Sequence, residues 1–206
     1  MKIKVCGMRN PDNIRALIKL DPDYIGFIFY PQSKRFISQV DHNILNEIPD
    51  SIKKTGVFVD ASLSEIQDIV KKNQLNAVQL HGNESVDTCR VLQELGIEVI
   101  KAFGVDESFD FTMLEPYTHV SDHFLFDTKT PLHGGSGISF DWKILENYKF
   151  NTSYFISGGL SLESLPSVKN IKDDRLYAAD LNSRFETEPG MKDIHKLEEA
   201  ITLLRS

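Results

Sequence analysis

Short runs of β-branched and aromatic residues alternate along the chain with longer amphipathic stretches. Such runs are typical of buried strands, and they begin about 20 to 30 residues apart, the length of one strand–loop–helix–loop unit. The pattern predicts eight strands, over residues 3–6, 24–29, 54–59, 77–80, 98–102, 123–126, 153–156 and 176–179.

Most intervals between these runs have helix signals. Asn10 followed by Pro11 predicts an N-cap and a first helical position, and Ser62 with Glu65 has capping-box spacing. Apolar stripes at helical spacing follow, and another stripe predicts a last helix beyond residue 191. The intervals after residues 102 and 126 show a weaker helical pattern.

Eight strand–helix units fit an open doubly wound sheet or a closed (β/α)₈ TIM barrel. Eight nearly equal repeats favour the barrel. With no linker-like stretch, we expect a single domain over residues 1–206. The longest irregular loops, residues 30–38 and 128–141, are then expected to carry function.

Composition narrows the class of protein. Of 206 residues, 41% are hydrophobic and 26% charged, as in globular proteins, and the net charge of -7 argues against a general binder of nucleic acid or anionic membranes. No apolar run is long enough to span a membrane and no signal peptide is evident. Two cysteines are too few for a disulfide framework or an all-cysteine zinc site, which indicates a protein of the reducing cytoplasm.

The residues at the predicted strand ends are mostly polar. Any strand that meets a loop has this property, and for Asp60 and Lys101 taken singly it is a sufficient reason. In a barrel, however, all these ends face one mouth, where catalysis takes place. The set comprises Cys6, Tyr30, Asp60, His81, Lys101, Phe103, Asp127, Ser157 and Asp180.

The two cysteines are interpreted differently. Cys89 lies on an apolar helical stripe and is expected in the core. Cys6 ends a strand before Gly7, at the rim of the barrel. A thiol, with a reference pKa of ~8.5, acts as a base or nucleophile when a cation or dipole stabilises its thiolate.

Asp127 ends a strand whose last three residues are apolar. Partial desolvation there favours the protonated carboxyl, which suits a proton donor. The alternatives are an N-cap or a salt bridge to Lys129.

Two glycine-rich loops follow strands six and seven, at Gly134–Gly137 and Gly158-Gly159. Backbone N–H groups after strands seven and eight are the usual phosphate site of barrels. Gly158-Gly159 and the segment from Asp180 to Arg184 therefore predict a phosphorylated ligand.

Arg35 lies in the loop after strand two, and we expect Phe27, Phe29, Tyr30 and Phe36 to surround it. An arginine framed by aromatic rings binds a carboxylate through its guanidinium fork while a ring packs alongside. His81 has no partner at metal-ligand spacing, so a pocket or structural role is favoured over a metal.

Several segments resemble the phosphoribosylanthranilate isomerase family. The similarity covers nearly the whole chain and is most specific in three motifs, which occur in the family's order: KVCGMR at 4–9, NAVQLHG at 76–82 and FDTKTPLHGGSGISFDW at 126–142. ISGGL at 156–160 is a further matching segment.

The resemblance implies a (β/α)₈ barrel and an Amadori rearrangement in tryptophan biosynthesis. N-(5-phospho-β-D-ribosyl)anthranilate would become 1-(2-carboxyphenylamino)-1-deoxy-D-ribulose 5-phosphate. Cys6 would be the general base and Asp127 the general acid. Arg35 would bind the anthranilate carboxylate, and the loops at Gly158, Gly159 and Ser183 the phosphate, with His81 and Asp180 also in the substrate site.

One departure is Arg184, where the family has a small residue, usually glycine. Either the backbone cradle differs there, or the guanidinium adds a phosphate contact. Two other functions remain open: a related aldose–ketose isomerase with carboxylates in both catalytic roles, and a catalytically silent binder of phosphorylated ligands. The chain is expected to be a monomer or homodimer.

Overall fold

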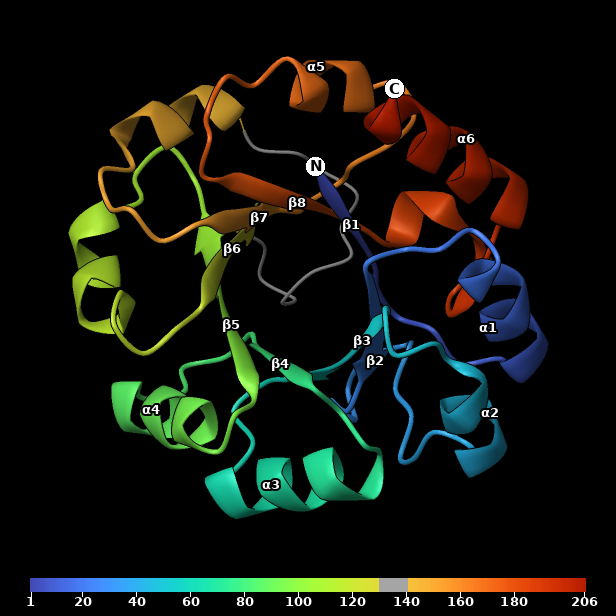
Figure 1. The fold of residues 1–206 in the computed structure, drawn as a ribbon. Coiled ribbons are helices and arrows are strands. Elements are labelled where there is room, and N and C mark those ends of the chain that lie inside the picture. Colours follow the sequence, from blue (N-terminus) through green and yellow to red (C-terminus); the bar gives the residue numbers. More distant parts are fainter. Residues whose placement is uncertain (130–140) are drawn as a thin grey trace.

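The structure, a computed structural model, describes residues 1–129 and 141–206. In these residues eight parallel strands form a closed barrel, in which β8 pairs with β1 (Figure 1). The strands are β1 (Lys2–Val5), β2 (Tyr24–Ile28), β3 (Lys53–Phe58), β4 (Ala77–Leu80), β5 (Glu98–Val105), β6 (His123–Thr128), β7 (Tyr154–Ile156) and β8 (Leu176–Leu181). The predicted (β/α)₈ barrel is confirmed and the open sheet is excluded.

Helices surround this barrel and cover its outer face (Figure 1). The α-helices are α1 (Pro11–Ile18), α2 (His42–Glu47), α3 (Leu63–Lys72), α4 (Val86–Glu94), α5 (Leu165–Lys169) and α6 (Ile194–Arg205). Both predicted caps are present: the Asn10 side chain accepts hydrogen bonds from two backbone N–H groups of α1, and Ser62 Oγ accepts one from Glu65 N.

The intervals with a weak helical pattern hold 3₁₀ helices, η1 (Phe111–Tyr117) and η2 (Trp142–Asn147). Pro116 lies inside η1 and has no N–H to donate, which disfavours a regular α-helix there. The long loop predicted over residues 128–141, with Gly134–Gly137, falls mainly outside the described residues.

Between β8 and α6 the chain adds a short segment that the sequence did not predict. It consists of a 3₁₀ turn, η3 (Ser183–Phe185), and an antiparallel hairpin of β9 (Glu186–Glu188) and β10 (Met191–Lys192). Gly190, with φ +86°, turns the chain between the two strands. Strands of only two or three residues are too short for a hydrophobic pattern, so a search for periodicity does not find them.

Successive residues of each strand point alternately away from the barrel axis and into the barrel, so the strands contribute to two separate hydrophobic clusters. Outward residues pack with the helices in the main core, which includes Cys89 as predicted. Inward residues fill the barrel, where Tyr24, Leu125 and Phe155 form part of a separate cluster. The amino end is closed by polar contacts, among them the hydrogen bond from Tyr24 Oη to Glu98 Oε1 at 2.8 Å. In the described residues, no helix is long and apolar enough to cross a membrane.

Candidate active site

The inward residues at the carboxyl ends of the strands line one end of the barrel, which we call the mouth. Cys6 comes directly after β1, His81 directly after β4, Asp127 near the end of β6 and Asp180 near the end of β8. Cys6, Asp127 and Asp180 are each at most 6% exposed. The mouth therefore holds a thiol and two carboxyl groups away from bulk water.

Cys6 is 3% exposed and packs against β2. A Cβ atom added to Gly26 would lie 2.8 Å from Cys6 Sγ, so the glycine on β2 provides the space for the sulfur. Burial raises the pKa of the Cys6 thiol, and the ammonium groups of Lys4 and Lys192 act in the opposite direction. Two cations, Lys4 and Lys192, thus act to stabilise a thiolate at Cys6, and the sequence analysis named such a cation as the condition for a base or nucleophile.

Asp127 makes contacts that fix its carboxyl group. One oxygen accepts a hydrogen bond from the next backbone N–H, and the other lies 3.4 Å from His81 Nε2. Gln79 Nε2 lies 2.9 Å from His81 Nδ1. With the Gln79 amide donating, the ring proton sits on Nε2 and faces Asp127. The alternative salt bridge to Lys129 is wrong, because Lys129 pairs with Asp106 at 2.7 Å.

Asp180 is held by a lysine that the sequence analysis did not select. Lys4 Nζ donates to Asp180 Oδ1 at 2.8 Å, and both side chains are buried. Burial acts to lower the pKa of Lys4, but Asp180 and Cys6 together outweigh it and the pKa is raised. The signal was present in β1, because the two-residue alternation places Lys4 on the same face as Cys6.

Arg35 reaches the mouth, with a side chain 13% exposed. Its Nε and Nη2 donate to the two carboxylate oxygens of Glu186. The predicted aromatic surround is wrong in part: Phe27 and Phe29 are outward residues of the β2 segment and are buried in the main core. Phe29 stacks on Phe58, with ring centroids 5.6 Å apart.

Glu186 belongs to the unpredicted hairpin and also binds Lys192, whose Nζ lies 2.6 Å from Glu186 Oε1. Lys192 donates in addition to Asn182 Oδ1 at 2.7 Å. Burial lowers the pKa of Lys192 to about 8, against the opposing effect of Glu186. The only sequence signal for Glu186 and Lys192 was the turn-forming pair Pro189-Gly190. This pair indicates a hairpin but not the residues that the hairpin contacts.

The predicted phosphate loop follows β7, with Gly158 at φ +86° and Gly159 at φ +66°. A Cβ atom on Gly158 would lie 2.3 Å from Thr128 Oγ1 and 3.0 Å from Asp127 Oδ1, so only glycine fits against β6 there. Among the described hydrogen bonds, none uses the N–H of either glycine. These two donors therefore remain available to a ligand beside Asp127.

Ser183 begins η3, after β8 and next to Arg184. Arg184 is not among the described residues with positive φ, so its side chain does not strain the backbone there. The helix after β7, α5, begins at Leu165, so Gly158 and Gly159 lie in the loop before it.

Within the described part of the chain, no group of three or more His, Cys, Asp or Glu residues is placed to hold a metal ion.

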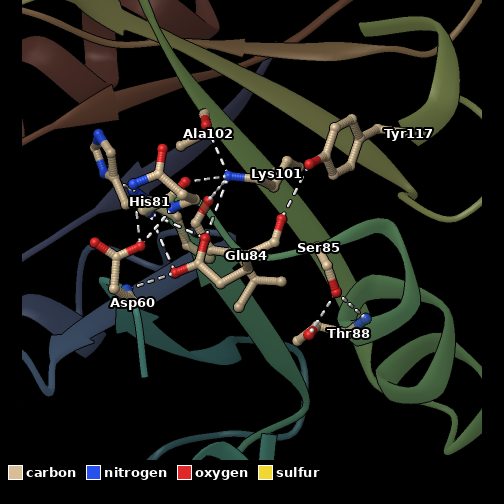
Figure 2. A network of polar contacts seen from close by, with 12 residues as sticks. Asp60, His81, Glu84, Ser85, Thr88, Lys101, Ala102 and Tyr117 are labelled. Carbon is tan, nitrogen blue, oxygen red and sulfur yellow. Dashed lines mark hydrogen bonds and ion pairs between the residues drawn. The ribbon is translucent and has the colours of Figure 1, made fainter. Parts of the chain in front are cut away.

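Lys101 and Asp60 belong to a second polar network, drawn in Figure 2 together with the neighbouring His81. Lys101 Nζ donates to two backbone carbonyls of the β4–α4 segment and lies 3.2 Å from Glu84 Oε2. Glu84 Oε1 accepts a hydrogen bond from the backbone N–H of Asp60. The Asp60 side chain accepts one from the backbone N–H of Asn83. The network ties the loops after β3 and β4 to β5, which supports the structural interpretation of both residues.

The fold and the ionisable groups at the mouth define a class: (β/α)₈ barrels that carry acid–base groups at the carboxyl ends of their strands. A family model described as N-(5'phosphoribosyl)anthranilate (PRA) isomerase matches residues 3–202. The chain belongs to this family.

Individual relatives agree with that placement. The chain is 44% identical over 203 residues to N-(5'-phosphoribosyl)anthranilate isomerase of Parabacteroides distasonis, covering 98% of this chain and 92% of the relative. The crystal structure of the Thermotoga maritima phosphoribosyl anthranilate isomerase superposes with a TM-score of 0.89 at 38% identity, covering 100% of this chain and 98% of that one.

A further similar structure contains a ligand. It is a phosphoribosyl anthranilate isomerase in complex with reduced 1-(o-carboxyphenylamino)-1-deoxyribulose 5-phosphate, with a TM-score of 0.86 and 34% identity. The match covers 100% of this chain and 98% of the other.

Proposed function

We propose that this protein converts N-(5-phospho-β-D-ribosyl)anthranilate into 1-(2-carboxyphenylamino)-1-deoxy-D-ribulose 5-phosphate, with Asp127 as general acid and Cys6 as general base. Family membership supports the reaction. The assignment of roles rests on one observation: the mouth holds a buried thiol directly after β1 and a buried carboxyl on β6, with β7 and β8 between them. A sugar seated in the mouth would present different atoms to each.

The steps follow from these positions. Protonation of the ring oxygen by Asp127 opens the furanose and leaves an iminium at C1. The Cys6 thiolate then takes the proton from C2, which gives an enolamine that tautomerises to the ketone. Asp127 has lost one proton and Cys6 has gained one, so transfer of one proton from thiol to carboxylate restores both. Each acid–base role typically contributes ~10²–10⁴-fold to the rate.

The binding roles are part of the same proposal. Because Glu186 occupies the Nε side of the Arg35 guanidinium, we assign the anthranilate carboxylate to the Nη1–Nη2 edge. The N–H groups of Gly158 and Gly159, with Ser183, bind the phosphate. His81 and Asp180 face the sugar, where they accept or donate hydrogen bonds to its hydroxyl groups.

The remaining assignments concern context. We propose that residues 1–206 act as one domain, since the main core includes residues from β1 to α6. Both cysteines are free and buried, which suits a reducing cytoplasm. The reaction as written needs no cofactor or metal. The protein is expected to be a monomer or homodimer, which light scattering after size-exclusion chromatography measures.

The test is a turnover assay. Phosphoribosylanthranilate is generated in situ, the purified protein is added without metal or nucleotide, and the loss of anthranilate-type fluorescence is followed. We expect rapid loss with the wild type and almost none with Asp127→Asn. Asp106→Asn is the control, because Asp106 is an exposed carboxylate paired with Lys129. No loss with folded wild-type protein would refute the activity, and wild-type rates in Asp127→Asn would refute its role.

A further inference from the structure

The ion pairs at the mouth are not balanced in charge. Lys4 pairs with Asp180, while Glu186 is shared between Arg35 and Lys192. Three cations thus face two carboxylates in these pairs, while Asp127, the other carboxyl group at the mouth, lies against His81. In a site of low polarity an uncompensated charge is costly, so the group favours one further negative charge nearby.

Cys6 lies where that charge is needed. The Cys6 N–H donates to Leu181 O, which sets the Cys6–Gly7 turn against the end of β8. A Cβ atom added to Gly7 would lie 3.0 Å from Asn182 Oδ1. The same oxygen accepts a hydrogen bond from the Lys192 ammonium group at 2.7 Å. The ammonium is therefore one hydrogen bond away from an atom packed on the Cys6–Gly7 turn.

We propose that Lys192 is a positioning residue for the reaction: with Lys4, its ammonium group stabilises the Cys6 thiolate, while Glu186 divides its own charge between Lys192 and Arg35. This inference rests on the proposed function, in which that thiolate is the base. It gives the β9–β10 hairpin a role in the chemistry, beyond closing the gap between β8 and α6.

The charged groups facing Cys6 give the direction of the effect. Lys4 from β1, Lys192 from β10 and Arg35 from the loop after β2 are cations, whereas Asp180 from β8 is an anion. Loss of a cation from this set raises the pKa of the thiol, and loss of an anion lowers it. Glu186 belongs to the same set through its bonds to Arg35 and Lys192.

The experiment measures alkylation of Cys6 by iodoacetamide against pH, in a Cys89→Ala background, with the product read by mass spectrometry. The midpoint of the profile reports the thiolate, and the plateau at high pH reports access to the sulfur. We expect Lys192→Met to move the midpoint up by about one pH unit, a tenfold lower rate below the midpoint. Glu186→Gln should move it down.

Lys101→Met is the matched control. Lys101 is also a buried lysine paired with a glutamate, but its charge is not among the main ones that act on Cys6. We expect its midpoint to equal that of the parent, and thermal melts check that every variant is folded. If Lys192→Met and Glu186→Gln leave the midpoint unchanged, or move it in the same direction, the inference is wrong.

The outcome is separable from that of the turnover assay. Opposite shifts in a protein that does not turn over would support the charge assignment and refute the proposed function. Turnover without any shift would support the proposed function and overturn the role of Lys192.

Discussion

Two regions of this barrel contain the same three ingredients in different surroundings. Each has a buried cysteine, a buried lysine paired with a glutamate, and a glycine with positive φ. At the mouth these are Cys6, Lys192–Glu186 and Gly158; around α4 they are Cys89, Lys101–Glu84 and Gly96.

The neighbours of each lysine make the difference. Lys101 donates mainly to backbone carbonyls and lies over the Phe103 ring, so its contacts end in the scaffold. Lys192 shares Glu186 with Arg35 and acts on Cys6, both of which we assign to the chemistry. Both lysines are 2% exposed. Burial and pairing alone therefore do not identify a functional residue; the groups that the pair touches do.

The largest expected difference is between the two cysteines. Cys6→Ala should lower kcat by ~10²–10⁴-fold because it removes the proposed base. Cys89→Ala should keep kcat within about twofold and lose only about 1 kcal/mol of unfolding free energy. Turnover assays and urea melts measure both. Equal losses of kcat in the two variants would remove the distinction between the regions.

The lysine near α4 should matter for stability. Lys101→Met leaves the buried Glu84 without its cation, and the free energy of unfolding should fall by ~3–5 kcal/mol. The value of kcat/KM per folded molecule should stay unchanged. Lys2→Met is the control, since the Lys2–Asp23 pair is exposed and worth about 1 kcal/mol or less. A folded Lys101→Met protein with a large drop in kcat/KM would place this network in the site.

The two glycines sharpen the comparison further. Gly158→Ala combines an unfavourable φ with a Cβ placed against Thr128 and Asp127, so both stability and kcat should fall. At Gly96, φ is +78° and nothing lies within 4 Å of the added Cβ, so Gly96→Ala should cost only ~1–2 kcal/mol of stability. Unchanged kcat in Gly158→Ala would mean that Asp127 tolerates displacement.

The smallest effect concerns pH. Lys192 has a folded-state pKa of about 8, below the ~10.4 of an unfolded lysine. Between these values the unfolded chain binds more protons, so stability should rise with pH relative to Lys192→Met. Thermal melts of both proteins from pH 7 to about 10.5 measure the difference. A wild-type stability that falls with increasing pH relative to Lys192→Met would contradict the lowered pKa of Lys192.

The fold was largely predictable because its signals are local. All eight strands and both caps came from short patterns, although β5 extends to Val105 rather than residue 102. The orientation of the segment after Gly26 was not predictable. Its run of Phe, Ile, Phe and Tyr is apolar on both faces, so alternation did not show that Phe27 and Phe29 face away from Arg35.

In the candidate site, too, some features were predictable from the sequence and others were not. The positions of Cys6, Asp127 and Asp180 followed from their places at strand ends. Their partners did not, because Arg35 and Glu186 lie 151 positions apart and nothing local couples them. Glu186 and Lys192 also lie in strands too short to carry a pattern.

The pairing of β1 with β8 has a consequence for the order in which the protein is made. Lys4 leaves the ribosome early, but its partner Asp180 follows 176 positions later. Until β8 and the hairpin are synthesised, β1 lacks one neighbour, and the Cys6 thiol has neither its cover nor the Lys192 charge. During this interval the thiol is open to oxidants. Synthesis of β8 and the hairpin therefore both completes the barrel and covers the Cys6 thiol.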